Sequence, residues 1–82
     1  MKKAEEYALI SRIILYDDHK AFENLMRLHQ NAIKNFLLKL LNFNENELDD
    51  LFQDTCTKIF QNIKKFRGDA TFSTWAFKIA YN

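Results

Sequence analysis

Residues that could do chemistry are few in this chain, and their spacing does not favour catalysis. His19, His29 and Cys56 do not stand at the spacing of a metal site. His29 falls among apolar residues at helical spacing, which predicts a hydrogen-bonded histidine in the core. Cys56 flanks an apolar face and is expected to act as a small hydrophobic residue. These residues are therefore expected to have structural roles and not to bind a metal.

Three carboxylates, Asp49, Asp50 and Asp54, lie near the start of one predicted helix. They could serve as a general acid–base pair only beside a basic or nucleophilic side chain, and none stands near them in the sequence. A single glycine also excludes a Gly-rich phosphate-binding loop. The sequence thus predicts no enzyme and no cofactor, and only an unexpected bound metal would revive that alternative.

Charges are sorted along the second half of the chain, acids first and bases after them. Acids favour a helix N-terminus and bases its C-terminus, each by roughly 0.3–1 kcal/mol, so a solvated helix face is one explanation. The other explanation is that the chain carries two binding surfaces of opposite charge. The acids are Glu45, Glu47, Asp49, Asp50 and Asp54, and the bases are Lys58, Lys64, Lys65 and Arg67.

The segment 64–82 combines cations with aromatic residues. This combination is typical of single-strand binding, because cations follow the phosphates while aromatic faces stack on bases, at about 1–3 kcal/mol each. The alternative is a core role, which we expect for Phe72, Trp75 and Ile79. Four other residues cannot all face inward with them: Phe77, Lys78, Tyr81 and Asn82.

Length and composition indicate one small helical domain. The 82 residues include no proline and one glycine, too few for the turns of an all-β fold. A net charge of +1 excludes a generally basic nucleic-acid coat, so a nucleic-acid site must be a local patch. One cysteine fits a reducing compartment. No apolar run reaches the ~18–20 residues that span a bilayer. We therefore expect a cytoplasmic protein without membrane insertion.

Helical periodicity predicts the first two elements over 5–16 and 18–41, with Asp17 and Asp18 available to cap the second. The second helix carries one broad apolar stripe. Its members recur at three- and four-residue spacing: Phe22, Leu25, Met26, His29, Ala32, Ile33, Phe36, Leu37 and Leu40.

A polar corner over 42–46 precedes a third helix that runs to about Phe66. Asn44 and Glu47 resemble a capping box at its start, and Gly68 is the expected left-handed residue at its end. The inner face is Leu48, Leu51, Phe52, Thr55, Ile59, Ile63 and Phe66; the outer face is Asp50, Gln53, Asp54, Thr57 and Gln61, with Phe60 at its edge.

Thr71 or Ser73 can cap a fourth helix, which has no stop signal before Asn82. We infer an all-α fold, a compact bundle of three to four helices whose last helix is truncated, and expect more protein to follow. Apolar surface bared by the truncation would favour homodimers of this fragment.

Three stretches resemble bacterial sigma factors of the extracytoplasmic-function type. ALISRIILYDDHKAFENLM (8–26) resembles their opening. DDLFQDTCTKIF (49–60) is similar to their polymerase-binding helix, whose pattern is Asp-Leu-x-Gln-acid, then five intervening residues, then Phe. FRGDATFSTWAFKIAYN (66–82) resembles their promoter-binding segment, with the Thr74-Trp75 pair in place. The match spans nearly the whole chain with its spacing kept.

The resemblance implies that 1–82 is a promoter-melting domain, the second conserved region of a sigma factor. The rest of the recognition helix and the domain that reads the −35 element are absent from these residues, so we expect weak DNA binding. In that family, the third helix docks on the coiled-coil clamp helices of the largest RNA polymerase subunit. The implied polymerase-binding residues are Asp49, Asp50, Gln53, Asp54 and Phe60.

The same resemblance implies that the last segment meets the −10 promoter element and holds its non-template strand once the DNA opens. Asn82 matches the family's Asn near which a flipped base is read, and Lys78 would neutralise phosphate. An anti-sigma factor is a further candidate partner. The implied DNA-binding residues are Lys65, Arg67, Ser73, Thr74, Lys78, Tyr81 and Asn82.

Some positions depart from the family pattern. Tyr16 replaces a common Gly, Ala76 replaces Leu, and Lys78 with Ile79 stand where housekeeping sigma factors carry an aromatic wedge. The last of these departures, at Lys78 and Ile79, predicts strict promoter dependence. A helical adaptor or homodimerisation module, with no DNA binding, remains the alternative function. A membrane-surface helix at FLLKLLNF (36–43) is disfavoured because its leucines fit the core stripe.

Overall fold

The computed structural model describes residues 3–81, which form four α-helices and two short 3₁₀ turns with no strand in that range. The all-α prediction is therefore confirmed. In chain order the elements are α1 (Lys3–Tyr16), α2 (His19–Leu40), η1 (Glu45–Glu47), α3 (Leu48–Asn62), η2 (Ile63–Lys65) and α4 (Phe72–Tyr81).

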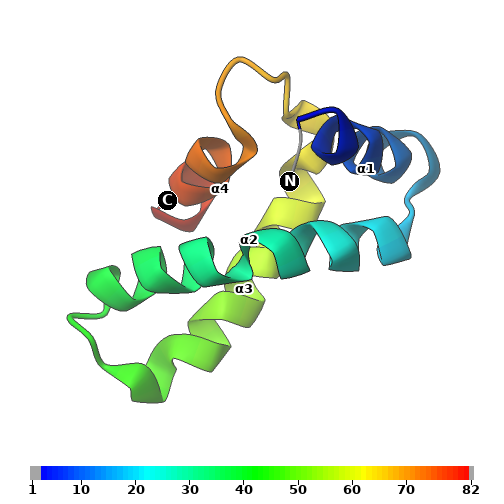
Figure 1. Cartoon of the computed structure of the whole chain (residues 1–82). Coiled ribbons are helices and arrows are strands. Elements are labelled where there is room, and N and C mark those ends of the chain that lie inside the picture. Colours follow the sequence, from blue (N-terminus) through cyan, green and yellow to red (C-terminus); the bar gives the residue numbers. More distant parts are fainter. Residues whose placement is uncertain (1–2, 82) are drawn as a thin grey trace.

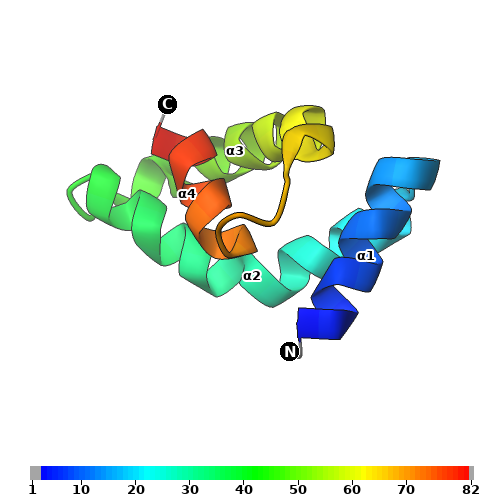
Figure 2. The same ribbon diagram turned by 90° about the horizontal axis from the view of Figure 1, so that it is seen from above.

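The long helix α2 organises the bundle, because α1, α3 and α4 all pack against it. α2 and α3 cross each other, and α4 packs on both of them (Figure 1). Seen from above, α1 lies across the first part of α2, away from α4 (Figure 2). The molecule measures 36 × 22 × 21 Å along its principal axes. Within residues 3–81, no helix has the length and apolar character needed to cross a membrane.

Asp18 starts α2, as its position in the sequence predicted. Its Oδ1 accepts a hydrogen bond from the backbone N–H of Ala21 at 3.0 Å, and its Oδ2 accepts one from Arg12 Nε at 3.1 Å. An N-cap of this kind satisfies a backbone donor that the first turn leaves unpaired. Asp17 completes the corner at φ 51°, a left-handed conformation that Asp tolerates better than most residues.

The core lies where α2 meets the other helices. The stripe prediction is confirmed at its centre, since Leu25, Ile33 and Leu37 are fully covered. It is wrong at Ala32 and Leu40, which are exposed, because Ala32 lies at the margin of the stripe and Leu40 is the last residue of α2. The buried apolar residues are Ile10, Ile13, Ala21, Leu25, Met26, Ile33, Leu37, Ile59, Ile63, Phe72 and Ala76.

The corner between α2 and α3 differs from the predicted capping box. Asn44 Oδ1 accepts from the N–H of Asn46 at 3.1 Å and thereby starts the 3₁₀ turn η1. Glu47 makes no side-chain capping bond, and α3 begins at Leu48. The physical reason is the short turn itself, whose three residues separate Asn44 from the first residue of α3.

The end of the third helix and the start of the fourth follow the prediction closely. α3 tightens into η2 and stops at Phe66, whose backbone is extended. Gly68 has φ +80°, and a Cβ there would meet nothing within 4 Å, so the backbone conformation rather than space favours glycine. Thr71 is the N-terminal cap, because its Oγ1 accepts from the N–H of Thr74 at 3.2 Å.

Candidate functional site

The outer side of α3 presents carboxylates and an amide to solvent. Asp49, Asp50, Gln53 and Asp54 are all exposed, and we call them the acidic face. Their exposure follows from the helical period, because Thr55, Ile59 and Ile63 turn the other side of the same rod into the core. Among residues 3–81, no base lies within ion-pair distance of these three carboxylates. The acidic face is therefore available to a cationic partner.

Phe60 is half-buried at the margin of α3 rather than fully exposed. Its ring stacks on His19 with centroids 5.0 Å apart and meets Phe22 edge-on at 4.9 Å. The side chain thus belongs partly to a satellite of the core, one of the two roles expected from the sequence. It also lines a surface hollow and remains reachable from outside.

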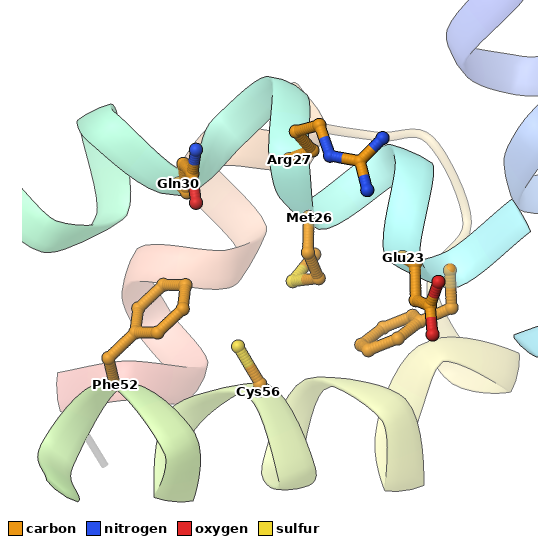
Figure 3. A pocket seen from close by; sticks show the side chains of 7 residues that line it. Glu23, Met26, Arg27, Gln30, Phe52 and Cys56 are labelled. Carbon is orange, nitrogen blue, oxygen red and sulfur yellow. The ribbon is translucent and has the colours of Figure 1, made fainter. Parts of the chain in front are cut away.

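An apolar groove that no sequence signal predicted runs between α2 and α3 beside Phe60. It consists of two hollows of about 330 and 320 Å³ that share Phe22 and Cys56. Met26 from α2 and Cys56 from α3 point toward each other across it (Figure 3). Burial raises the pKa of the Cys56 thiol, which is therefore protonated at neutral pH. Lys34 Nζ lies 4.7 Å from the ring centroid of Phe52 at the groove.

Cations of the last segment are exposed. Lys65, Arg67 and Lys78 all reach solvent, and in the described part of the chain none of them forms an ion pair. Lys64 differs, because its Nζ lies 3.5 Å from Asp17 Oδ1. The three free cations, rather than Lys64, are the groups available to an anionic ligand.

Aromatic residues of this segment divide between core and surface. Phe72 is 1% exposed and packs its ring against Phe66 and Trp75, as expected for a core residue. Phe77 also turns inward and stacks on Phe36, with centroids 4.6 Å apart. Tyr81 is 73% exposed, so its ring can stack on a ligand.

Two of the polar residues expected at the DNA surface have different surroundings. Thr74 is exposed near the start of α4, and its hydroxyl accepts from that of Thr71 at 2.9 Å. Ser73 is half-buried, with Oγ 3.1 Å from His29 Nδ1. Asn82 lies outside the described residues.

His29 is a hydrogen-bonded, largely buried histidine, as its place in the apolar stripe predicted. Its Nε2 bonds to Glu6 on α1 and its Nδ1 to Ser73 on α4. Across residues 3–81, no group of histidine, cysteine and carboxylate side chains is arranged to hold a metal ion. No sequence signal identified the partners of His29, because they are 23 and 44 positions away.

The chain is similar to transcription proteins. The family model described as Sigma-70 region 2 matches residues 25–82. The ECF RNA polymerase sigma-E factor of Haemophilus influenzae is 32% identical over 77 residues, covering 94% of this chain and 39% of that protein. The RNA polymerase sigma-H factor of Pseudomonas aeruginosa is 27% identical over 82 residues, covering 100% of this chain and 42% of that protein.

A shorter match is the ECF RNA polymerase sigma-E factor of Escherichia coli K12, at 29% identity over 65 residues, 79% of this chain and 33% of that protein. The chain spans about two fifths of the length of the first two relatives. No solved structure matches it.

Proposed function

This chain belongs to the Sigma-70 region 2 family, and on that premise we propose that it takes part in transcription initiation as the region-two domain of a sigma factor. It binds RNA polymerase through α3 and promoter DNA through the segment 65–82. The observation that carries the proposal is the division of exposed charge in the fold: carboxylates on α3, free cations on the η2–α4 segment. Binding, without catalysis, is the mechanism.

The polymerase partner is the pair of clamp helices in its largest subunit, and the acidic face is the docking surface. Asp50, Gln53 and Asp54 stand on the exposed side of a helix that the core holds rigidly, which lowers the entropy lost on binding. Asp49 adds negative charge at the same surface. Phe60 supplies an apolar contact next to the groove, since part of its ring is reachable.

The DNA partner is the non-template strand of the −10 element. Lys65, Arg67 and Lys78 neutralise its phosphates, while Thr74 and Ser73 hydrogen-bond to it near the start of α4. Tyr81 stacks on a base, and Asn82 reads a base flipped from the stack. Extruding a base costs a few kcal/mol, which stacking and hydrogen bonds to its edge offset. An anti-sigma factor that covers these surfaces, and a place beside the polymerase in the cytoplasm, belong to the same proposal.

Clamp binding by matched variants tests the proposed function. Asp50→Asn and Gln53→Ala should each weaken binding of the chain to isolated clamp helices by about five- to tenfold, measured by calorimetry, because each removes one exposed contact group. The control is Glu5→Gln, which removes the same charge as Asp50→Asn from an exposed position on α1. If the Asp50→Asn and Gln53→Ala variants bind the clamp helices as tightly as the wild type does, the assignment of the acidic face as the docking surface is contradicted.

A further inference from the structure

A chain of hydrogen bonds joins three helices at His29. Glu6 Oε1 on α1 bonds to His29 Nε2 on α2, and His29 Nδ1 lies 3.1 Å from Ser73 Oγ on α4. The side chains of Glu6 and His29 are each 16% exposed. The imidazole ring also lies 5.0 Å from the ring of Phe72. Ser73, a proposed DNA contact, is thus tied to a titratable ring and through it to a carboxylate.

The donors and acceptors of this chain follow from the chemistry of its groups. An ionised carboxylate only accepts, so His29 Nε2 must carry the proton that is donated to Glu6. In the neutral ring Nδ1 is then an acceptor, and the Ser73 hydroxyl donates to it. When the ring gains a second proton, Nδ1–H becomes a donor and Ser73 Oγ must accept. Protonation of His29 therefore reverses the direction of the Ser73 hydrogen bond.

We propose that His29, held by Glu6, is a positioning residue that sets whether the Ser73 hydroxyl is free to donate to DNA. With neutral His29, the Ser73 proton is committed to Nδ1. With protonated His29 that proton is released and can be donated to a phosphate or base oxygen, which accept only. The inference rests on the proposed DNA binding. It adds that the protonation of His29 controls one contact in that binding, the hydrogen bond from the Ser73 hydroxyl to DNA.

The groups that contact His29 come from α1 and α4. Glu6 is the carboxylate that contacts the ring, and α4 contributes the uncharged Phe72 and Ser73. Lys3, Tyr7 and Asp69 line a surface hollow together with Glu6. Protonation of the ring turns its contact with Glu6 into an ion pair.

The first test needs no DNA. Nitrogen NMR of the ¹⁵N-histidine-labelled chain distinguishes the two neutral tautomers. We expect His29 to carry its proton on Nε2, with Nδ1 as the acceptor, at high pH. His19 serves as the internal reference ring, since it stacks on Phe60 instead. A neutral His29 with its proton on Nδ1 would overturn the proposal.

The second test follows single-strand affinity with pH between about pH 5 and pH 8, the range in which imidazole titrates. Binding of a short −10 strand should tighten by about three- to tenfold as His29 is protonated, which is the worth of one hydrogen bond. Ser73→Ala keeps the charge change on His29 but removes the hydroxyl, so only a residual electrostatic response should remain. His29→Gln should abolish the response, and His19→Gln should retain it.

The outcomes separate the two ideas. A pH response as large in Ser73→Ala as in the wild type, or one retained in His29→Gln, would overturn the positioning role while leaving DNA binding intact. Absence of strand binding by every variant at every pH would overturn the proposed DNA function and the role of His29 with it. Thermal melts of each variant across the same pH range identify changes that come from unfolding alone.

Discussion

Salt dependence of strand binding gives a quantitative test of the proposed DNA surface. Lys65, Arg67 and Lys78 are exposed and free of ion pairs within residues 3–81, so each can displace one counterion. For single strands each phosphate contact contributes about 0.7 to the slope of log affinity against log salt, so three contacts give a slope near −2. Raising salt from about 50 to 200 mM should then weaken binding roughly 18-fold.

Neutralising one of these cations should remove one contact. Lys65→Gln is expected to reduce the slope to about −1.4, so that the same rise in salt weakens binding only roughly sevenfold. The matched control is Lys64→Gln, one position away. Lys64 Nζ already lies 3.5 Å from Asp17 Oδ1, so this variant should leave the slope near its wild-type value. Chemical-shift titration with a short single strand can measure the weak affinities expected for this chain. A wild-type slope near zero, or identical slopes for Lys64→Gln and Lys65→Gln, would refute the assignment.

Three further predictions concern the fold and its ionisable groups. Phe72→Ala should lower the free energy of unfolding by about 3–5 kcal/mol in urea titrations, because the side chain is 1% exposed in the core. The backbone N–H of Ala21 holds the pKa of Asp18 below its usual range. The ionised carboxylate therefore stabilises the fold at pH values above the pKa that Asp18 has in the unfolded chain, and this stabilisation is lost as the pH falls through the lowered pKa of the folded state. Asp18→Asn, which can still cap, should therefore flatten the acid side of a plot of melting temperature against pH. Burial raises the pKa of the Cys56 thiol, and the positive charge of Lys34 partly opposes that rise. A thiol reagent should therefore react more slowly with the folded chain than with the unfolded chain, and more slowly still with the folded Lys34→Gln variant.

Each of these three has a contradicting result. A loss below about 1 kcal/mol for Phe72→Ala would mean that the ring is not in a close-packed core. Superimposable acid transitions for wild type and Asp18→Asn would remove the role of that carboxylate's charge. Equal thiol reaction rates in the folded and unfolded chain would show that Cys56 is not protected by burial.

Local sequence signals predicted the helices and their caps. The stripe on α2 was readable because Leu25, Ile33 and Leu37 recur with the helical period and face one core. Asp18 and Thr71 cap where they were expected, since a cap depends on residues only three positions away. The exposure of the acidic face followed from the same periodicity.

Contacts between distant residues were beyond the reach of those signals. The groove depends on how α2 crosses α3, which no periodicity encodes, so Phe22 and Cys56 gave no hint of meeting there. His29 was predicted to be hydrogen-bonded, but its partners Glu6 and Ser73 come from other helices. The 3₁₀ turn that delays α3 was also missed, because an Asn-Glu capping pattern is compatible with more than one turn.

The central claim is that one small fold offers two separate surfaces, one to RNA polymerase and one to an unpaired strand. A single labelled sample can test it by NMR, with clamp helices added first and a −10 single strand second. We predict that clamp helices perturb the exposed side of α3, that the strand perturbs residues 65–81, and that both ligands are bound together. Displacement of one ligand by the other, or perturbation of the same residues by both, would contradict the account.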